Sequence, residues 1–268
     1  MSAEYSISDL RYLMSRLRDP KTGCPWDIKQ TYKTIAPHSI EEVYEVVDAI
    51  ERGDIQHLSE ELGDLLFQII FYSQLGEEDN QFDFDMVVSK ITAKLLRRHP
   101  HVFPDGTLAS MRSSDSPADE AEIKQTWERI KRQERSDKGE PRTLDDIPRA
   151  LPALSRAVKL QKRAAVTGFD WAEASAVVAI VKGELAELEA EIASGDAQKI
   201  EEELGDLLFS VANLARHLSV DPEKALASGN NKFKRRFERM EDLAGAGKFS
   251  QLNVDEMEQL WVRVKLAE

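Results

Sequence analysis

The sequence EELGDLLF occurs twice in this chain, at residues 60–67 and 202–209. Four carboxylates around it, and a Gly-Asp pair at 53–54 and 195–196, also recur with a constant offset of 142 residues. An internal repeat constrains the fold, because each copy is expected to form the same local structure. The chain is therefore predicted to contain two related halves. The paired carboxylates are Glu42 and Glu184, Glu45 and Glu187, Glu61 and Glu203, and Asp64 and Asp206.

Apolar residues in both halves follow the period of an α-helix, and strand and hairpin signals are nearly absent. The sequence thus predicts an all-α protein with two tandem helical bundles of about five helices each. Polar stretches predict a mobile loop at 104–118 and a linker at 136–148, which gives predicted domains of 1–135 and 149–268. Helices are expected near 6–18, 39–52, 55–77, 83–98 and 119–135, and near 151–165, 173–193, 197–218, 222–243 and 254–266.

Three helix starts carry capping signals. Ser39 with Glu42 fits a capping box, and so does Asn253 with Glu256. Asp221 before Pro222 fits an N-cap followed by proline at the first helical position.

Charge and cysteine content narrow the function classes. A net charge of −13 argues against a general binder of nucleic acid or of anionic membranes. Cys24 is the only cysteine, so an intrachain disulfide is excluded and a reducing compartment is indicated. The first residues lack the pattern of a signal peptide, and no apolar stretch is long enough to span a membrane, so the cytoplasm is the expected location.

The repeated carboxylates predict a metal site. On a helix, Glu42 and Glu45 share a face, and Glu61 and Asp64 share one on the next helix. The short link at 53–54 predicts that the two helices pack antiparallel, which brings the four carboxylates together. The apolar residues at 62, 65, 66 and 69 predict that this patch of carboxylates borders the core. Clustered anions repel, and a hard divalent cation such as Mg²⁺, Mn²⁺ or Ca²⁺ would neutralise them.

Other interpretations of these residues compete with a metal site. A single Glu-x-x-Glu is usually a solvated helix face, but duplication at unchanged spacing favours metal binding. A di-iron bundle would need Glu-x-x-His, which the sequence lacks. Walker, Rossmann and nucleophile-elbow motifs are also absent.

Cations and tryptophans recur after each acidic quartet. Because residues four apart share a helix face, each basic pair and each Trp–Lys pair forms one patch. Such patches can bind polyphosphate while the aromatic ring stacks on a base. The alternatives are solvated helix ends for the cations and core packing for the tryptophans. The pairs are Lys94 and Arg98, Lys232 and Arg236, Trp127 and Lys131, and Trp261 and Lys265.

With these motifs the chain resembles the MazG family of nucleoside triphosphate pyrophosphohydrolases, in the all-α NTP pyrophosphatase superfamily. The resemblance spans nearly the whole chain. It rests on RLRDPKTGCPWD (16–27), EEVYEV (41–46), EELGDLLF (60–67), RRHPHVF (97–103), LDDIPRALPAL (144–154), GFDW (168–171), EEELGDLLF (201–209), NKFKRRF (231–237) and the late Trp261-x-x-x-Lys265.

The resemblance implies Mg²⁺-dependent hydrolysis of (deoxy)nucleoside triphosphates to the monophosphate and pyrophosphate, and a homodimer. It implies that the C-terminal domain is the main catalytic one, with Glu184, Glu187, Glu203 and Asp206 as metal ligands and catalytic residues. Lys232, Arg236, Trp261 and Lys265 would bind the nucleotide. In the first half, Pro100 ends the helix soon after Arg98, which also favours the second site.

Two further interpretations stay open. The chain can be an acidic helical protein-interaction module with vestigial sites, or a relative with one preferred nucleotide substrate. Neither stable nucleic-acid binding nor membrane binding is expected.

Overall fold

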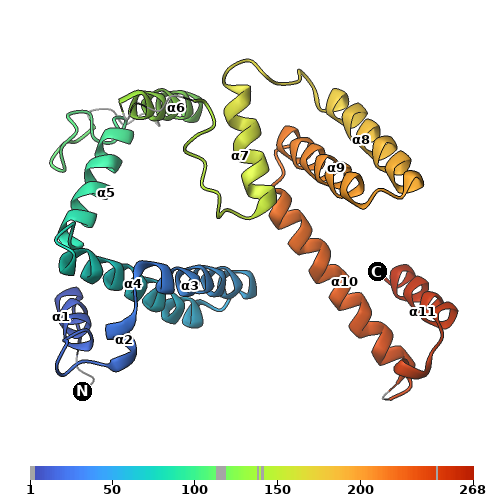
Figure 1. Ribbon diagram of the computed structural model, residues 1–268, viewed down its shortest axis with the longest axis horizontal. Coiled ribbons are helices and arrows are strands. Elements are labelled where there is room, and N and C mark those ends of the chain that lie inside the picture. The colour runs from blue at the N-terminus through green and yellow to red at the C-terminus, as the bar shows by residue number, and fades with distance from the viewer. Residues whose placement is uncertain (1–3, 113–118, 138, 140–141, 246) are drawn as a thin grey trace. The chain divides into compact units, whose positions relative to one another are not determined.

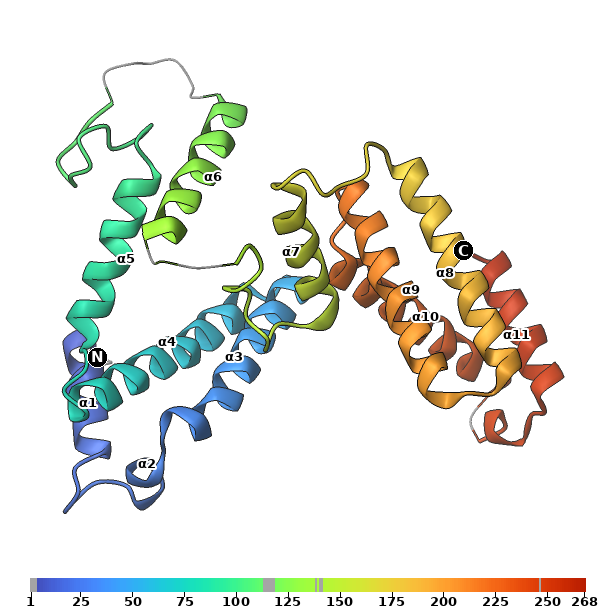
Figure 2. The same ribbon diagram turned by 45° about the horizontal axis from the view of Figure 1, so that its top comes forward.

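The computed structural model describes residues 4–112, 119–137, 139, 142–245 and 247–268 (Figures 1 and 2). Every regular element in these residues is a helix, which confirms the predicted all-α class. The chain divides into two compact units, Met1–Glu134 and Arg135–Glu268. No helix among the described residues is long and apolar enough to cross a membrane.

The N-terminal unit is built around one long central helix. Helix α4 packs against α1 and α3, and α5 follows it. Its buried core consists of Met14, Ile35, Ile70, Phe71 and Leu75. The helices are α1 (Ile7–Leu17), α2 (Pro25–Lys29), α3 (Tyr32–Arg52), α4 (Ile55–Glu78), α5 (Phe84–Arg98) and α6 (Glu120–Asp137), the last of which ends beyond the boundary between the units.

In the C-terminal unit α9 packs against both α7 and α8. Helices α10 and α11 form a separate pair around Met240, Leu260 and Val264. The elements are α7 (Ala153–Ala165), α8 (Ala174–Ser194), α9 (Ala197–His217), α10 (Pro222–Ala244), the short 3₁₀ helix η1 (Phe249–Gln251) and α11 (Val254–Leu266).

The repeated Gly-Asp pair forms the same tight turn in both units. Gly53 and Gly195 end α3 and α8 with φ values of 70° and 76°, in the left-handed region that favours glycine. The following aspartate caps the next helix: the backbone N–H of His57 donates to Asp54, and those of Gln198 and Lys199 donate to Asp196. Each turn folds two helices back on one another, as predicted.

Helix α3 begins at Tyr32 rather than near residue 39, so the predicted Ser39–Glu42 capping box is wrong. Thr31 caps the helix through a reciprocal pair of hydrogen bonds with Thr34. The Ser39 hydroxyl instead lies within the helix and donates to the carbonyl of Ile35. Pro37 lies inside the helix as its sixth residue, so the helix continues there without the N–H that proline lacks.

Other helix boundaries match the predictions more closely. Asp221 and Asn253 cap α10 and α11 as expected, and α5 ends at Arg98, just before Pro100. The sequence did not predict α2 or η1, because elements of five and three residues are too short to show a period. Part of the predicted loop, 113–118, and part of the predicted linker, 138 and 140–141, lie outside the described residues.

Candidate active site

The N-terminal unit brings three of the four predicted carboxylates together. Ligand oxygens of Glu42, Glu45 and Glu61 lie within 4.8 Å of one another, and Glu61 is buried. Burial raises the pKa of Glu42, and the neighbouring charges of Asp64 and Glu45 raise it further. Asp64 is exposed at the edge of this group.

The C-terminal unit repeats the arrangement on α8 and α9. Oxygens of Glu184, Glu187 and Glu203 again lie within 4.8 Å of one another. Burial raises the pKa of Glu184, and the charges of Glu187, Asp206 and Glu203 add to the effect. The pKa of Glu203 is raised by burial and by Glu187 and Asp206. We call these groups the N-terminal and C-terminal carboxylate clusters.

Both clusters fit a hard divalent cation. Every donor is a carboxylate oxygen, the ligand type that Mg²⁺, Mn²⁺ and Ca²⁺ prefer. The raised pKa values of Glu42, Glu184 and Glu203 show that the ionised carboxylates are poorly compensated by the protein alone. A cation held between them would remove this repulsion.

The two clusters differ in the contacts that their carboxylates already receive from other side chains of the protein. Nε2 of His57 lies 2.8 Å from Oε1 of Glu61, and Nε2 of Gln68 donates to Glu42 at 3.3 Å. The equivalent positions in the second half are Lys199, which lies 3.7 Å from Glu191, and Ser210, which donates to the carbonyl of Leu207. Among the described residues, none donates a hydrogen bond to the carboxylates of the C-terminal cluster.

The apolar residues beside the N-terminal cluster face outward. Leu62, Leu66 and Ile69 are 49%, 36% and 41% exposed, whereas Glu61 of the cluster is buried, so the prediction that this patch borders the core is confirmed only in part. Helix α4 contributes Ile70 and Phe71 to the buried core of this unit. The C-terminal unit shares this feature, with exposed apolar side chains along α8 and α9 at Val178, Leu185, Ile192, Leu204, Leu208, Phe209 and Val211.

In the N-terminal unit two of the predicted cations, Arg98 and Lys131, are already paired with acidic side chains. Both Arg98 and its neighbour Arg97 donate to Glu134, which lowers the pKa of that carboxyl to about 2. Nζ of Lys131 lies 2.9 Å from Glu128. The Trp127 ring is partly buried and meets His99 edge-on, with ring centroids 5.3 Å apart. Lys94 is partly buried on α5.

The C-terminal unit builds a similar group on α10 and α11, which we call the basic–aromatic cluster. The guanidinium of Arg236 lies over the Trp261 ring, 5.5 Å from its centroid. The same guanidinium donates to Glu268 through Nε and Nη2, at 3.0 and 2.6 Å. Lys232 and Lys265 are exposed and have no ion-pair partner among the described residues.

A single chain does not bring the carboxylate cluster and the cations of its unit together. The C-terminal half of α10 and all of α11 stand away from the α8–α9 pair, and the C-terminal half of α5 and all of α6 stand away from the α3–α4 pair (Figure 1). The carboxylates lie on the helix hairpins and the cations on these arms. The predicted composite site is therefore split between two helix pairs in each unit.

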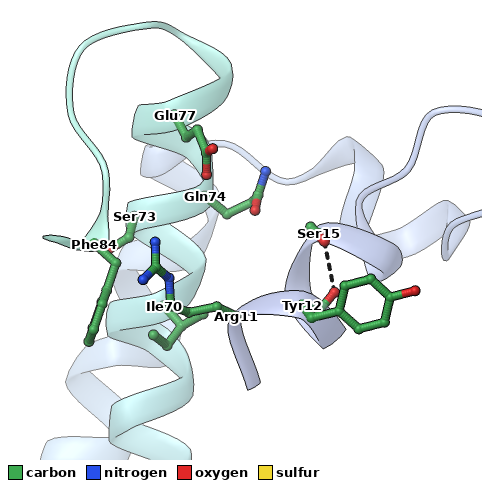
Figure 3. Close-up of a pocket in the computed structure, with 8 residues that line it drawn as sticks. All are labelled: Arg11, Tyr12, Ser15, Ile70, Ser73, Gln74, Glu77 and Phe84. Atoms are coloured by element: carbon green, nitrogen blue, oxygen red, sulfur yellow. Dashed lines mark hydrogen bonds between the residues drawn. The ribbon is translucent and has the colours of Figure 1, made fainter. Parts of the chain in front are cut away.

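A pocket between α1 and α4 of the N-terminal unit lies apart from the predicted site residues. Its lining includes Arg11, Ser73 and Phe84, but none of the predicted ligands (Figure 3). Arg11 is paired with Asp85 and lies over the Phe84 ring, 5.2 Å from its centroid. The candidate chemistry thus rests on the carboxylate clusters rather than on this pocket.

Comparison with known proteins shows which family the chain resembles. A family model described as the MazG nucleotide pyrophosphohydrolase domain matches residues 30–103 and 173–240. The chain is similar to the nucleoside triphosphate pyrophosphohydrolase of Escherichia coli strain K12, with 48% identity over 98% of each chain. It is 39% identical to the nucleoside triphosphate pyrophosphohydrolase/pyrophosphatase MazG of Thermotoga maritima, over 97% of this chain and 95% of that protein. It is 38% identical to the uncharacterized protein YabN of Bacillus subtilis, over 98% of this chain and 52% of that protein.

Proposed function

The chain belongs to the MazG nucleotide pyrophosphohydrolase family, and we propose that it hydrolyses (deoxy)nucleoside triphosphates to nucleoside monophosphates and pyrophosphate. One observation carries the proposal. The chain holds two clusters of carboxylates whose oxygens lie within 4.8 Å of one another, on helices that the family model matches. Such clusters suit a divalent cation that reverses the sign of an acidic site and so admits a polyphosphate.

In the C-terminal unit, Glu184, Glu187, Glu203 and Asp206 would hold Mg²⁺, or Mn²⁺ as a substitute. When bound, the cation would lower the pKa of a water molecule and offset charge at the phosphates. A carboxylate of the cluster would accept the proton as the water oxygen bonds to the α-phosphorus. The bond from that phosphorus to the bridging oxygen breaks, and pyrophosphate leaves with the bridging oxygen.

The basic–aromatic cluster would bind the rest of the nucleotide. Lys232, Arg236 and Lys265 would neutralise the phosphates, and Trp261 would stack on the base. Stacking on a ring tolerates every base, which supports broad substrate acceptance. Lys94, Arg98, Trp127 and Lys131 would have the same roles in the N-terminal unit.

We propose that a homodimer completes the site. Carboxylates and cations lie on separate helix pairs within each unit, and a second copy would bring them together. The exposed apolar side chains along α8 and α9 support this arrangement, because a contiguous apolar surface of this kind marks an interface. Phe233 and Phe237 on α10, 58% and 37% exposed, offer a matching apolar surface on the arm.

We assign the main catalytic role to the C-terminal unit. Its carboxylates carry no hydrogen bond from a described side chain, and its Lys265 has no described ion-pair partner. The corresponding groups of the N-terminal unit are partly satisfied by His57, Gln68 and Glu128. Where side chains already contact one another, those contacts must be given up when a cation or a polyphosphate binds, and the net binding free energy is smaller.

The test is product identification. The full chain is incubated with Mg²⁺ and a panel of NTPs and dNTPs, and the products are separated by anion-exchange chromatography. The proposal expects monophosphate and pyrophosphate in equal amounts. Diphosphate with orthophosphate would indicate a different phosphohydrolase. The absence of any product would favour an acidic interaction module with vestigial sites, and activity on one nucleotide alone would favour a relative with a single preferred substrate.

A further inference from the structure

A third element recurs beside the tryptophan and lysine of each half. Glu134 and Glu268 follow Trp127 and Trp261 by seven residues, so both halves read Trp-x-x-x-Lys-x-x-Glu. Seven residues make about two helical turns, which places Glu134 on the face of Trp127 in α6, whereas Glu268 lies two residues beyond the end of α11 at Leu266. The offset between the two copies is 134 residues for all three positions.

Each glutamate meets the paired arginines of the preceding long helix. In the C-terminal unit Glu268 accepts two hydrogen bonds from Arg236, and Nη2 of Arg235 lies 3.7 Å from its Oε1. In the N-terminal unit Glu134 accepts from both Arg97 and Arg98. Two units that differ in many other contacts therefore build the same carboxylate–arginine contact.

The hydrogen bonds use only one edge of the guanidinium. Nε and Nη2 of Arg236 both donate to Oε2 of Glu268, and Nη1 has no acceptor among the described residues. Arg98 presents the same Nε and Nη2 edge to Glu134. An arginine held in this way keeps its remaining N–H groups in a fixed direction, and little rotamer entropy is left to lose when an anion binds.

We propose that Glu268 is a positioning residue for substrate phosphate, and that it fixes Arg236 over Trp261 with Nη1 directed to the nucleotide. This inference rests on the proposed function for its substrate. Lys232 and Lys265 are not neutralised by a described carboxylate, so the patch keeps a positive charge although Glu268 is present. Glu134 would act in the same way on Arg98.

The opposite role would be competition, in which Glu268 occupies the place of a phosphate and must leave before substrate binds. The two roles predict opposite changes in anion affinity when Glu268 is removed. Removing a negative charge beside a cation favours anion binding on Coulomb grounds alone. If positioning dominates, the same removal weakens binding, because the guanidinium must then be ordered by the ligand.

The experiment compares wild type with Glu268→Ala and Glu268→Gln, with Glu258→Gln as the control. Glu258 is an exposed glutamate on α11, the helix that precedes Glu268, with no described contact. Affinity for inorganic tripolyphosphate is measured by calorimetry, and kcat and KM by pyrophosphate release. Positioning predicts that affinity falls and KM rises about tenfold in Glu268→Ala, as expected for one weakened charge-assisted hydrogen bond. Glu268→Gln, which keeps an acceptor, should be intermediate, and kcat should change little.

Unchanged or tighter tripolyphosphate binding in Glu268→Ala would overturn the proposal. If Glu268→Ala loses its helical circular dichroism, the same test is applied to Glu268→Gln instead, because glutamine keeps the shape of the glutamate side chain. The two proposals fail separately. If wild type releases no pyrophosphate but binds tripolyphosphate more tightly than Glu268→Ala does, the proposed reaction is wrong and the positioning role stands. If wild type does not bind tripolyphosphate, the positioning role is wrong.

Discussion

In the N-terminal unit, Nε2 of His57 lies 2.8 Å from Oε1 of Glu61, whereas Glu203, the counterpart of Glu61, has no such partner among the described residues. One substitution between the repeats accounts for the difference. Position 199, which corresponds to His57, carries a lysine that lies near Glu191. The duplicated carboxylates thus have unequal access to an incoming cation.

His57→Ala is expected to tighten divalent-cation binding at the N-terminal cluster about threefold to tenfold, because Glu61 then gives up no hydrogen bond to bind the ion. The measurement is calorimetric titration with Mn²⁺ in a Glu203→Gln background, so that the N-terminal cluster dominates. His38→Ala is the control, since His38 lies 3.7 Å from Glu41, outside the cluster. Weaker Mn²⁺ binding in His57→Ala would show that His57 instead orients the Glu61 carboxylate for the cation.

Glu184→Gln is expected to raise the thermal unfolding temperature of the metal-free protein at pH 7 but not at pH 4. The folded-state pKa of Glu184 is raised above its ordinary value of 4.5. The stability linked to its protonated form is present below that value and is lost as pH rises through the raised pKa. Glutamine stays neutral at both pH values and avoids the loss.

The experiment follows unfolding by circular dichroism in EDTA. Glu189→Gln, an exposed position on the same helix, is the control. Added Mg²⁺ should stabilise wild type and have less effect on Glu184→Gln. Equal responses of the two proteins to Mg²⁺ would argue against cation binding at this cluster.

Trp261→Phe is expected to raise KM for a dNTP about threefold to tenfold and to leave tripolyphosphate affinity nearly unchanged. The smaller ring stacks less well on a base, and a base–aromatic stack contributes ~1–3 kcal/mol. Trp127→Phe in the N-terminal unit is the matched control and should leave steady-state kinetics near wild type. A parallel loss of dNTP and tripolyphosphate binding would indicate that Trp261 only supports the fold.

Asp170→Asn is expected to destabilise the C-terminal unit at neutral pH. Asp170 accepts hydrogen bonds from Arg216 and lies 3.1 Å from Nε2 of His217, which ties the turn before α8 to the end of α9. Chiefly through Arg216, the pKa of Asp170 falls to about 2. Its stabilising effect is therefore present above its ordinary pKa of 3.8 and is lost as pH falls towards 2.

Urea unfolding of Asp170→Asn should show a loss of ~1–3 kcal/mol at pH 7, the cost of leaving partly buried donors unsatisfied. The difference from wild type should shrink as pH approaches 2. A difference that stays constant across this range would mean that the carboxylate charge is unimportant.

The repeat predicted much of this architecture, because a glycine and an aspartate at fixed spacing dictate the turn between paired helices. Glu42, Glu45 and Glu61 could be placed together from helical spacing and one short loop. The start of α3 was not predicted, because Ser39 with Glu42 fits a capping box at a place that lies within the helix. The outward position of Leu62 and Leu66 also escaped prediction, because periodicity marks an apolar face but not what covers it.

Two contacts in the structure were not predicted from the sequence. The bond from Gln68 to Glu42 joins neighbouring helices, and nothing in the local sequence distinguishes that glutamine from a solvated one. The contact of Glu268 with Arg236 was detectable in principle, because Glu134 and Glu268 share the offset of the repeated tryptophan and lysine.

The most direct test of the C-terminal carboxylate cluster compares pyrophosphate release by wild type, Glu61→Gln and Glu203→Gln in saturating Mg²⁺ and dNTP. Both glutamines preserve shape and remove one ligand charge, so each serves as the control for the other. The account predicts that Glu203→Gln lowers kcat by about a hundredfold or more with unchanged helical content, while Glu61→Gln keeps most activity. Near-wild-type kcat in Glu203→Gln, with activity lost in Glu61→Gln, would contradict it.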